Sequence, residues 1–531
     1  MLEGSELQST LKRLTDSELV YRRGRPSLPT YVFKHALVRD AAYNMLVRSR
    51  REELHTAIAR ALEEGFPGTV ESEPELLAYH YGQAGRNPTN IIKALNYLSV
   101  ARERARSRSA LNEAVSHIQR ALQLIATLPE DESRRRRQLE LQIALVGTLQ
   151  QQKGYAHPDV FAACAKTLGL LDDSDPEMHL AVHYLLFAAH YVGGQSTKML
   201  DDAKAFLAIA RQQQETTPTA TGHRVLGNRL VGTAHLITGN IGEAITKLHE
   251  ALAGYDRIEH APTSPVGQTL RARFVQDVGV TIDSYLSWAL WLSGQLGRVA
   301  QHADAALAKG RQSQHTTSLF YALWHAGIAY VLLRDSEQVE RLGSELTKLA
   351  DEHELEYWQA LGDFLRGWHA TQVGHAPVAI ALLERGLQRW KNTGAQAFRP
   401  ILLSFLASAY AAAQEPEHAR RNLEEALKVA DDTGEQWATP EIYRLLADLS
   451  MRNNPAAALE QYERAISLAN AQASPSFELR ATTSWARVMS KRRNTSDASN
   501  RLLKIYRRFD EGLDTPDLMD AKALLSTSRT T

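Results

Sequence analysis

Three histidines with the spacing of metal ligands are the first candidates for chemistry in this 531-residue sequence. His179 and His183 are four residues apart on a predicted helix, and His190 follows on the same helix. Two imidazoles at positions i and i+4 lie on one helical face and can bind a transition metal. No third ligand of a suitable type is evident nearby. Packed or surface histidines are therefore the favoured interpretation, and no metal site is predicted.

Cysteine chemistry is restricted to a single residue, Cys164. One cysteine excludes an intrachain disulfide framework and a cysteine-cage metal site, and it is typical of a reducing compartment. The neighbours of this cysteine are Phe161 and alanines at positions 162, 163 and 165. This apolar setting predicts a buried, inert thiol.

A run of four arginines, Arg134–Arg137, could contact nucleic acid. However, Glu130, Asp131 and Glu132 precede the run and Glu140 follows it, so the local charge is nearly balanced. A solvated helix start is the favoured interpretation. The whole chain agrees, because 61 basic and 61 acidic residues give a formal net charge of +0, whereas nucleic-acid-binding domains are normally basic.

The composition places the chain among globular proteins, with 44% apolar and 23% charged residues. Its length exceeds what one hydrophobic core supports, so several domains or a repeat array are expected. No apolar run approaches the roughly 18–20 residues of a membrane span. Residues 1–6 lack the basic and apolar regions of a signal peptide. A cytoplasmic location is therefore predicted.

Helical periodicity dominates from about residue 35 onward. Leu402, Phe405, Leu406 and Ala409 show it, because they lie at positions i, i+3, i+4 and i+7. Helices of about 15 residues, separated by Gly, Asn, Asp or Pro, continue to the end of the chain. Apart from one short N-terminal stretch, no convincing strand is present.

Small residues recur every 40 residues in the middle of predicted first helices, at Ser287, Gly327, Gly367, Ala407 and Ala447. Twelve residues after the middle three, small or β-branched residues occur in predicted second helices: Val339, Ala379 and Ala419. A small residue in mid-helix lets a partner helix approach closely, so we expect paired helices.

The order small, aromatic, small, large, small resembles the tetratricopeptide repeat. It is cleanest at Leu406-Ala407, Tyr410, Ala419, Leu423 and Ala426, and it recurs around Gly232 and Gly367. The period of about 40 exceeds the usual 34 of that repeat, which fits longer helices and links. The wider gap from Gly232 to Ser287 predicts an insertion, with residues 260–267 as its loop. Such a repeat array is a solenoid with a concave groove, which usually binds a partner.

Tryptophans are concentrated in the middle of the array, and three of them lie in consecutive first helices of the repeats. Trp288 and Trp368 each follow the small residue of their repeat, and Trp324 precedes its small residue by three positions. In tetratricopeptide arrays this region tends to face the groove, where exposed aromatic rings could anchor a peptide. Packing between repeats is the alternative. We predict Trp288, Trp324 and Trp368 as partner-binding residues.

The N-terminal region has a different pattern. Leu7–Leu14 is a predicted helix, residues 19–23 and 30–34 are predicted strands around a turn, and predicted helices follow at Ala36–Leu46 and Ser49–Glu64. Helix, hairpin, helix is the order at the end of a winged-helix fold. The predicted fold is therefore all-α: a tetratricopeptide-like helical-hairpin solenoid with a small N-terminal winged-helix remnant that contains a β-hairpin.

Several segments together resemble the C-terminal region of bacterial STAND-type ATPases that are linked to class III adenylate/guanylate cyclase domains. These segments are Leu11–Tyr21, Tyr31–Tyr43, Arg48–His55, Pro74–Tyr81, Lys153–Pro158 and Arg507–Leu518, with a looser match at Gln123–Pro129. The resemblance implies a winged-helix module, a repeat array, and an ATPase with a cyclase that would precede residue 1. This sequence itself has no G-x-x-x-x-G-K-[ST] loop and no paired metal-binding aspartates of a cyclase.

His35 is the residue that the resemblance singles out. In STAND ATPases with this motif, the histidine approaches the β-phosphate of bound ADP, and an imidazole can donate to a phosphate oxygen. A structural histidine at a helix start is the alternative. ATP or ADP is thus implied only for the ATPase part, and no cofactor is predicted for this chain. Arg22, Arg23 and Arg25 on the hairpin are expected to contact that ATPase rather than DNA.

The predicted domains are residues 1–68, a winged-helix remnant; 69–215, a helical linker with the first hairpins; 216–512, the repeat array; and 513–531, a C-terminal helix and tail. The predicted function is a non-catalytic sensor and scaffold. It would bind a protein or small effector in the repeat groove and regulate an attached ATPase or cyclase. The alternatives are a stand-alone protein-interaction adaptor and a winged-helix transcription regulator.

Overall fold

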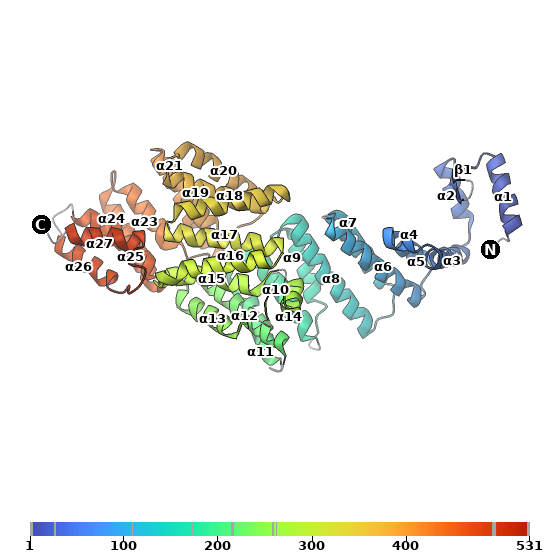
Figure 1. The fold of residues 1–531 in the computed structure, drawn as a ribbon, viewed down its shortest axis with the longest axis horizontal. Coiled ribbons are helices and arrows are strands. Elements are labelled where there is room, and N and C mark those ends of the chain that lie inside the picture. Colours follow the sequence, from blue (N-terminus) through green and yellow to red (C-terminus); the bar gives the residue numbers. More distant parts are fainter. Residues whose placement is uncertain are drawn as a thin grey trace. The chain divides into compact units, whose positions relative to one another are not determined.

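The computed structural model describes residues 4–25, 28–108, 110–172, 175–213, 217–256, 260–261, 263–274, 276–490 and 495–527. Within these ranges the chain forms 27 α-helices, one short 3-10 helix at Leu296–Arg298 and one two-stranded sheet (Figure 1). The predicted all-α class is therefore confirmed. The chain divides into two compact units, Met1–Thr148 and Leu149–Thr531, so the boundary falls inside the segment 69–215 that was predicted as one region.

The first unit begins with a helix and an antiparallel β-hairpin, and only helices follow. Its elements are α1 (Gly4–Asp16), β1 (Val20–Arg25), β2 (Leu28–Phe33), α2 (Ala36–Met45), α3 (Arg48–Gly65), α4 (Pro67–Ser72), α5 (Pro74–Gln83), α6 (Pro88–Ser107), α7 (Leu111–Ile125) and α8 (Glu132–Lys153), which runs into the second unit. Val20 pairs with Phe33. The predicted order of helix, hairpin, helix, helix is confirmed, although both strands extend further toward the turn than expected.

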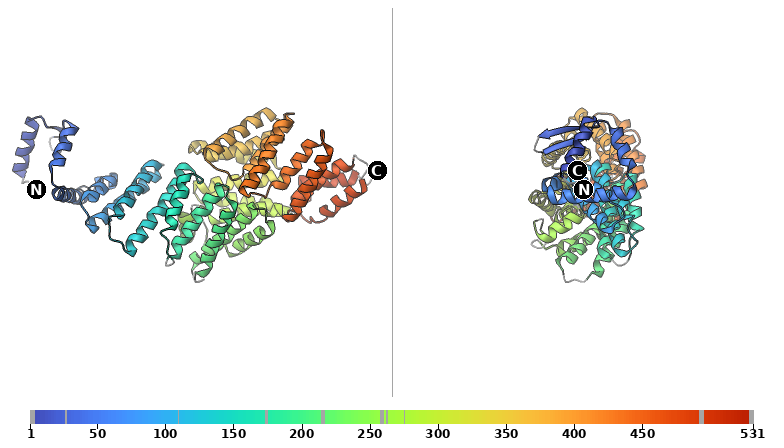
Figure 2. Two further views of the ribbon diagram at one scale, coloured as in Figure 1. Left: turned by 180° about the vertical axis from the view of Figure 1, so that it is seen from behind. Right: turned by 90° about the vertical axis from the view of Figure 1, so that its right-hand side faces the viewer.

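The second unit consists mainly of helix pairs. Its helices are α9 (Pro158–Leu168), α10 (Pro176–Val192), α11 (Ser196–Gln212), α12 (Pro218–Ile237), α13 (Ile241–Gly254), α14 (Pro265–Phe274), α15 (Val278–Leu292), α16 (Val299–Gln312), α17 (Thr316–Leu333), α18 (Ser336–Glu352), α19 (Glu356–Gln372), α20 (Ala376–Asn392), α21 (Arg399–Ala412), α22 (Pro416–Thr433), α23 (Thr439–Ser450), α24 (Pro455–Ala471), α25 (Pro475–Ser490), α26 (Thr495–Tyr506) and α27 (Pro516–Thr527). Helices α10, α12, α15, α17, α19, α21, α23 and α25 are the first helices of their pairs, and α9, α14 and α27 lie outside the pairs. Figure 2 shows these pairs from two further directions.

Local sequence sets the limits of these helices. The Asp277 carboxylate accepts from the Val280 N–H at 2.9 Å before α15, and Asp335 accepts from the Gln338 N–H at 3.1 Å before α18. These N-caps satisfy backbone donors that the first helical turn leaves free. Helix α22 ends at Gly434, whose φ of 73° lies in the left-handed region that glycine adopts without strain.

The 40-residue repeat predicted from small residues is confirmed, because Ser287, Gly327, Gly367, Ala407 and Ala447 are all buried. A Cβ added at Gly327 would lie 2.5 Å from Leu365 of α19, and one added at Gly367 would lie 2.6 Å from Leu383 of α20. The helices therefore pack in direct contact at these positions, within the pair at Gly367 and between pairs at Gly327.

The predicted insertion between Gly232 and Ser287 is present, but it is not only a loop. Helix α14 (Pro265–Phe274) begins inside residues 260–267, and Phe274 is buried against Tyr184 and Phe206. Pro262 lies outside the described residues. Phe274, seven residues beyond the expected loop, anchors the insertion to the core.

The pairs of the second unit wind into a superhelix in which five pairs complete one turn. The N–H groups of Gln396 and Ala397, before α21, donate to the Val192 carbonyl at the end of α10 at 2.8 and 3.1 Å. The N–H groups of Gln436 and Trp437, before α23, donate in the same way to the Ile237 carbonyl at the end of α12, at 2.9 and 3.3 Å. The second turn thus satisfies carbonyls that helix ends of the first turn leave free.

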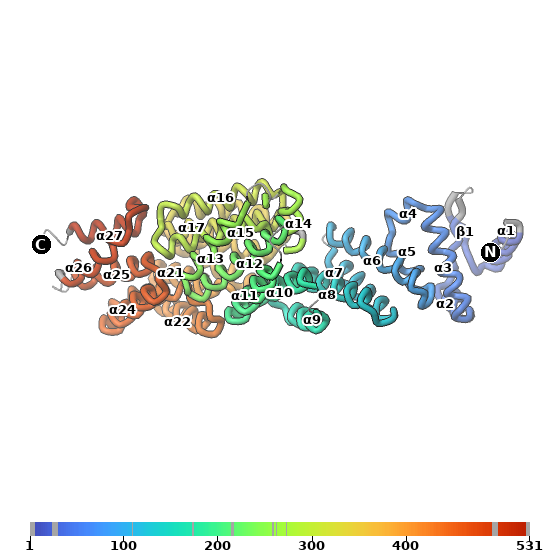
Figure 3. The backbone as a smooth tube through the Cα atoms, turned by 90° about the horizontal axis from the view of Figure 1, so that it is seen from below, coloured from blue at the N-terminus to red at the C-terminus, as the bar shows by residue number. Residues whose placement is uncertain are grey.

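Hydrogen bonds between successive superhelical turns continue further along the chain. Before and within α25, the hydroxyls of Ser474 and Ser476 donate to the carbonyls of Leu292 and Trp291 at the end of α15, at 3.1 and 2.5 Å. Figure 3 shows the backbone of these helices from below. The interior of the first turn is closed by side chains of the second.

Helix α17 corrects one expectation, because its 18 residues Thr316–Leu333 are long and apolar enough to cross a membrane. Of this stretch, 78% is buried inside the structure, where α17 packs on α15, α16, α18 and α19. Its apolar surface on all sides is the surface of a helix surrounded by other helices.

Candidate partner-binding groove

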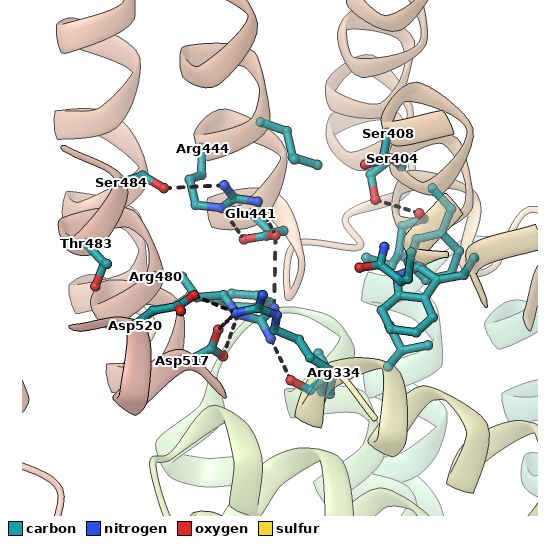
Figure 4. Close-up of a pocket in the computed structure, with 18 of the residues that line it drawn as sticks. Arg334, Ser404, Ser408, Glu441, Arg444, Arg480, Thr483, Ser484, Asp517 and Asp520 are labelled. Carbon is teal, nitrogen blue, oxygen red and sulfur yellow. Dashed lines mark hydrogen bonds and ion pairs between the residues drawn. The ribbon is translucent and has the colours of Figure 1, made fainter. Parts of the chain in front are cut away.

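A groove of about 330 Å³ opens on the inner face of the superhelix, where six successive odd-numbered helices from α17 to α27 meet (Figure 4). It is lined by Val331, Leu332, Arg334, Trp368, Gln372, Ile401, Ser404, Phe405, Ser408, Glu441, Arg444, Leu445, Phe477, Arg480, Thr483, Ser484, Arg487, Asp517 and Asp520. Because first helices form the inner face of each pair, the 40-residue repeat brings residues far apart in sequence to one surface.

Ion pairs fix the floor of this groove. Arg480 pairs with Asp517 at 2.7 Å and donates to the Leu332 carbonyl at 2.6 Å, which ties α25 and α27 to the end of α17. Arg334 continues the network to Asp517 at 3.3 Å and to Asp520 at 2.9 Å. Figure 4 shows the Arg480 guanidinium between Glu441 and Asp517.

Glu441 and Arg444 form a second pair, at 2.7 Å, one helical turn apart on α23. Burial opposes ionisation of Glu441, but the charges of Arg444 and Arg480 and the hydrogen bonds from Arg444 outweigh it and lower the pKa of this carboxyl below its ordinary value. Both groups are therefore charged near neutral pH. Salt bridges of this kind hold the wall in place.

Three donors in the groove have no partner among the described residues. The exposed Arg487 makes no ion pair or hydrogen bond through its guanidinium, although four arginines and only three carboxylates line the groove. The hydroxyl of Thr483, one helical turn earlier on α25, is buried without a hydrogen bond. The indole N–H of Trp368 also donates to no described residue. A ligand with carboxylate or carbonyl oxygens would satisfy all three.

The predicted tryptophan site is wrong for two of its three residues. Trp288 is 0% exposed and Trp324 is 1% exposed, so neither ring presents a face to a partner. Trp368, 8% exposed, lies in the wall of the groove. Only Trp368 therefore keeps the predicted position.

The second turn of the superhelix explains this burial. Trp437 stacks on Trp288 with ring centroids 5.4 Å apart, and Phe398 lies 5.5 Å from Trp324. The Trp288 indole N–H donates to the His325 carbonyl at 2.8 Å. Aromatic side chains from one turn later thus cover both tryptophans.

The sequence contains a signal for this stacking that the tryptophan pattern did not include. Residues 393–400 and 433–440 share the pattern Thr-Gly-x-Gln-x-x-x-Pro, 40 residues apart. The glutamine N–H of each segment donates to a carbonyl of the first turn. The aromatic residues that fill the axis, Phe398 and Trp437, lie inside these two segments.

The histidines of α10 form hydrogen bonds typical of packed residues. His183 and His190 contact the two carboxylate oxygens of Asp202 at 3.3 and 2.6 Å, and His179 contacts the Asp172 carbonyl at 2.8 Å. Burial disfavours a charged Asp202, but these hydrogen bonds outweigh it and lower the pKa of the carboxyl. Within the described ranges, no group of three or more His, Cys, Asp or Glu side chains is arranged to hold a metal.

The remaining candidates have simple environments. Cys164 is buried as predicted, and burial together with the charge of Asp202 raises the pKa of its thiol to about 12. Residues 134–137 lie in the first turns of α8, where the Arg134 side chain donates to the Leu128 carbonyl at 2.8 Å, as expected for a helix start. His35 is exposed at the N-cap of α2, and its side chain makes no capping hydrogen bond.

Comparisons with known proteins support the repeat architecture. The tetratricopeptide-repeat family profile matches residues 398–471. An uncharacterised protein of Rhizobium meliloti (strain 1021) is 21% identical over 461 residues, which cover 84% of this chain and 42% of that protein. The chain thus spans less than half the length of this relative.

Among solved structures, a Rap protein complexed with Competence and Sporulation Factor superposes with a TM-score of 0.51 at 10% identity, over 71% of this chain and 99% of that chain. The human IFIT1 dimer with m7Gppp-AAAA covers 82% of this chain and 90% of its own, with 14% identity and a TM-score of 0.43. The second unit is thus a tetratricopeptide-like helical solenoid.

Proposed function

We propose that this chain is a non-catalytic binding array whose groove recognises an extended, carboxylate-bearing segment of a protein partner. The observation that carries the proposal is the free guanidinium of Arg487 beside the unpaired donors of Thr483 and Trp368. The neighbouring arginines are already neutralised by fixed carboxylates, so the one remaining cation defines where an acidic side chain would bind. An aromatic wall next to it supplies apolar contact area.

The test is a peptide array that scans acidic, neutral and basic residues at each position, probed with the full chain. We expect acidic peptides to bind, with affinity falling as salt increases. Arg487→Glu should weaken this binding about tenfold or more, because it replaces the free cation by a like charge. Arg421→Glu is the matched control, since Arg421 is exposed on α22 and lies outside the groove. Equal binding by both variants would contradict the proposal.

We further propose that the array regulates an attached ATPase or adenylate/guanylate cyclase module in the cytoplasm. Support comes from the sequence resemblance, from the helix–hairpin–helix order of the first unit, and from the relative more than twice as long as the matched region. His35 would contact a nucleotide phosphate there. Its exposed ring, free of a capping bond, is compatible with this role.

This second proposal requires the longer protein that carries a nucleotide-binding part. In that protein, His35→Ala should weaken ADP binding relative to ATP binding, because the histidine is expected to donate to the β-phosphate. Arg22 and Arg23, exposed on β1, should then contact the ATPase. Unchanged nucleotide binding would favour a stand-alone adaptor. A salt-dependent DNA complex that is lost on replacing these arginines would favour a transcription regulator.

A further inference from the structure

A second cavity, which shares no lining residue with the groove, lies at the inner face of the first superhelical turn. Its volume is about 60 Å³, and aromatic side chains from α10, α15, α17 and α19 surround it. Of its lining residues, Tyr285, Tyr321 and Phe187 are buried, whereas Tyr357 and Trp358 are partly exposed, so we take the side of Tyr357 and Trp358 as the mouth of the cavity. The cavity is therefore open to a small solute.

An arginine without a carboxylate partner lies in this cavity. Arg229 of α12 is 2% exposed, and it forms no ion pair with any described carboxylate. Its Nε atom is buried without a hydrogen bond. The guanidinium interacts instead with the hydroxyl of Tyr184 and with the face of the Phe187 ring, which lies 5.9 Å from the guanidinium carbon. A buried, unpaired charge is strongly unfavourable, so proteins normally pair such an arginine with an anion.

Three tyrosines beside Arg229 add an unused proton. Tyr321 and Tyr285 are hydrogen-bonded through their hydroxyls at 2.7 Å, and Tyr285 and Tyr191 at 2.9 Å. Three hydroxyl protons serve only two hydrogen bonds, so one proton has no acceptor among the residues that the structure describes, whichever hydroxyl donates. The positive charge of Arg229 acts to lower the pKa values of Tyr285 and Tyr321, although burial raises them more. The guanidinium and the hydrogen-bonded tyrosines therefore share one electrostatic environment.

We infer that this cavity binds a small monocarboxylate, with Arg229 holding the carboxylate group and the tyrosine chain donating the additional hydrogen bond. One negative charge balances the one guanidinium, and a planar carboxylate matches the fork of N–H donors. A phosphate dianion would bring a second charge that no described cation of the cavity lining would balance. The walls take an apolar tail, since Phe187, Val192 and Trp358 are among the lining residues.

The size of the cavity limits the ligand. A cavity of about 150 Å³ is known to hold benzene, whereas this one has about 60 Å³. A short aliphatic acid is therefore the expected occupant, and longer carboxylates would project through the mouth past Trp358. This inference does not rest on the proposed function of the groove, and either can fail without the other.

The test uses the full chain and sodium propionate as the probe, with calorimetric titration and thermal unfolding as readouts. Propionate should bind and raise the unfolding midpoint, whereas propionamide and an equal concentration of sodium chloride should not, because only propionate supplies a carboxylate. Arg229→Met should weaken propionate binding about ten- to a hundredfold. Without ligand, this variant should unfold no earlier than the wild type, since it removes an unpaired buried charge.

Tyr191→Phe serves as the second variant, because it removes one hydroxyl of the three hydrogen-bonded tyrosines while keeping the ring. It should weaken propionate binding several-fold and leave unfolding without ligand nearly unchanged. Equal effects of propionate, propionamide and chloride would overturn the inference. Propionate binding that survives in Arg229→Met would also overturn it, as would a strongly destabilised Arg229→Met variant together with wild-type binding in Tyr191→Phe.

Discussion

Gly367 offers the sharpest test of the helix packing that builds both binding surfaces. It lies in the middle of α19, and a Cβ at this position would lie 2.6 Å from Cγ and 2.8 Å from Cδ2 of Leu383 on α20. Leu383 is fully buried, so another rotamer would press its side chain against other atoms of the core. Gly367→Ala therefore forces the two helices apart by several tenths of an ångström.

Two opposing effects set the magnitude. Overpacking a tight helix contact costs about 1–3 kcal/mol. Replacing a mid-helix glycine by alanine stabilises the helix by about 1 kcal/mol, because alanine has the higher helix propensity. We therefore expect Gly367→Ala to lower the free energy of unfolding by about 1 kcal/mol, and Gly367→Leu to lower it further. Gly242→Ala is the matched control, because Gly242 is exposed in α13 and a Cβ there would meet no atom within 4 Å.

Intrinsic fluorescence is a suitable assay, since all eight tryptophans lie in the second unit. The difference between the two alanine variants isolates the overpacking and should be about 1–3 kcal/mol, or roughly 2–6 °C in the unfolding midpoint. If Gly367→Ala is as stable as Gly242→Ala, then α19 and α20 are not in contact at this position, and the 40-residue register is wrong.

Three further predictions concern single groups. The purified chain should neither hydrolyse ATP nor make cyclic AMP, because its sequence contains no phosphate-cradling loop; turnover that is abolished by a substitution within the chain would contradict this. Burial raises the pKa of Glu435 from 4.5 to about 7, although N–H groups of Trp437 and Phe398 donate to it. The stability that the neutral carboxyl contributes is therefore complete below about pH 4.5, and about 3 kcal/mol of it is lost as the pH rises to about 7 and above. The unfolding midpoint of the wild type should consequently fall relative to that of Glu435→Gln between pH 5 and pH 8. Cys164 should react with a thiol reagent only after unfolding, because its raised pKa of about 12 keeps the thiol protonated; fast reaction in the native state would refute its burial.

The local features of the fold could be predicted from sequence because they depend on neighbours along the chain. Helical periodicity, the 40-residue spacing of Gly327 and Gly367 and the N-terminal hairpin each report a backbone preference or a single helix–helix contact. The buried Cys164 followed from its alanine neighbours. These predictions needed no knowledge of how distant repeats meet.

The binding surfaces depended on the superhelical turn, which no single repeat encodes. Trp288 lies at a repeat position that predicts a place in the groove, but Trp437, almost 150 residues later, covers it. Arg229 and Arg487 look like ordinary surface arginines in the sequence. Only the stacking of five helix pairs per turn decides that Arg229 is buried among tyrosines and that Arg487 is exposed at the groove. Pair-to-pair rotation accumulates over the array, so its result is a property of the tertiary structure.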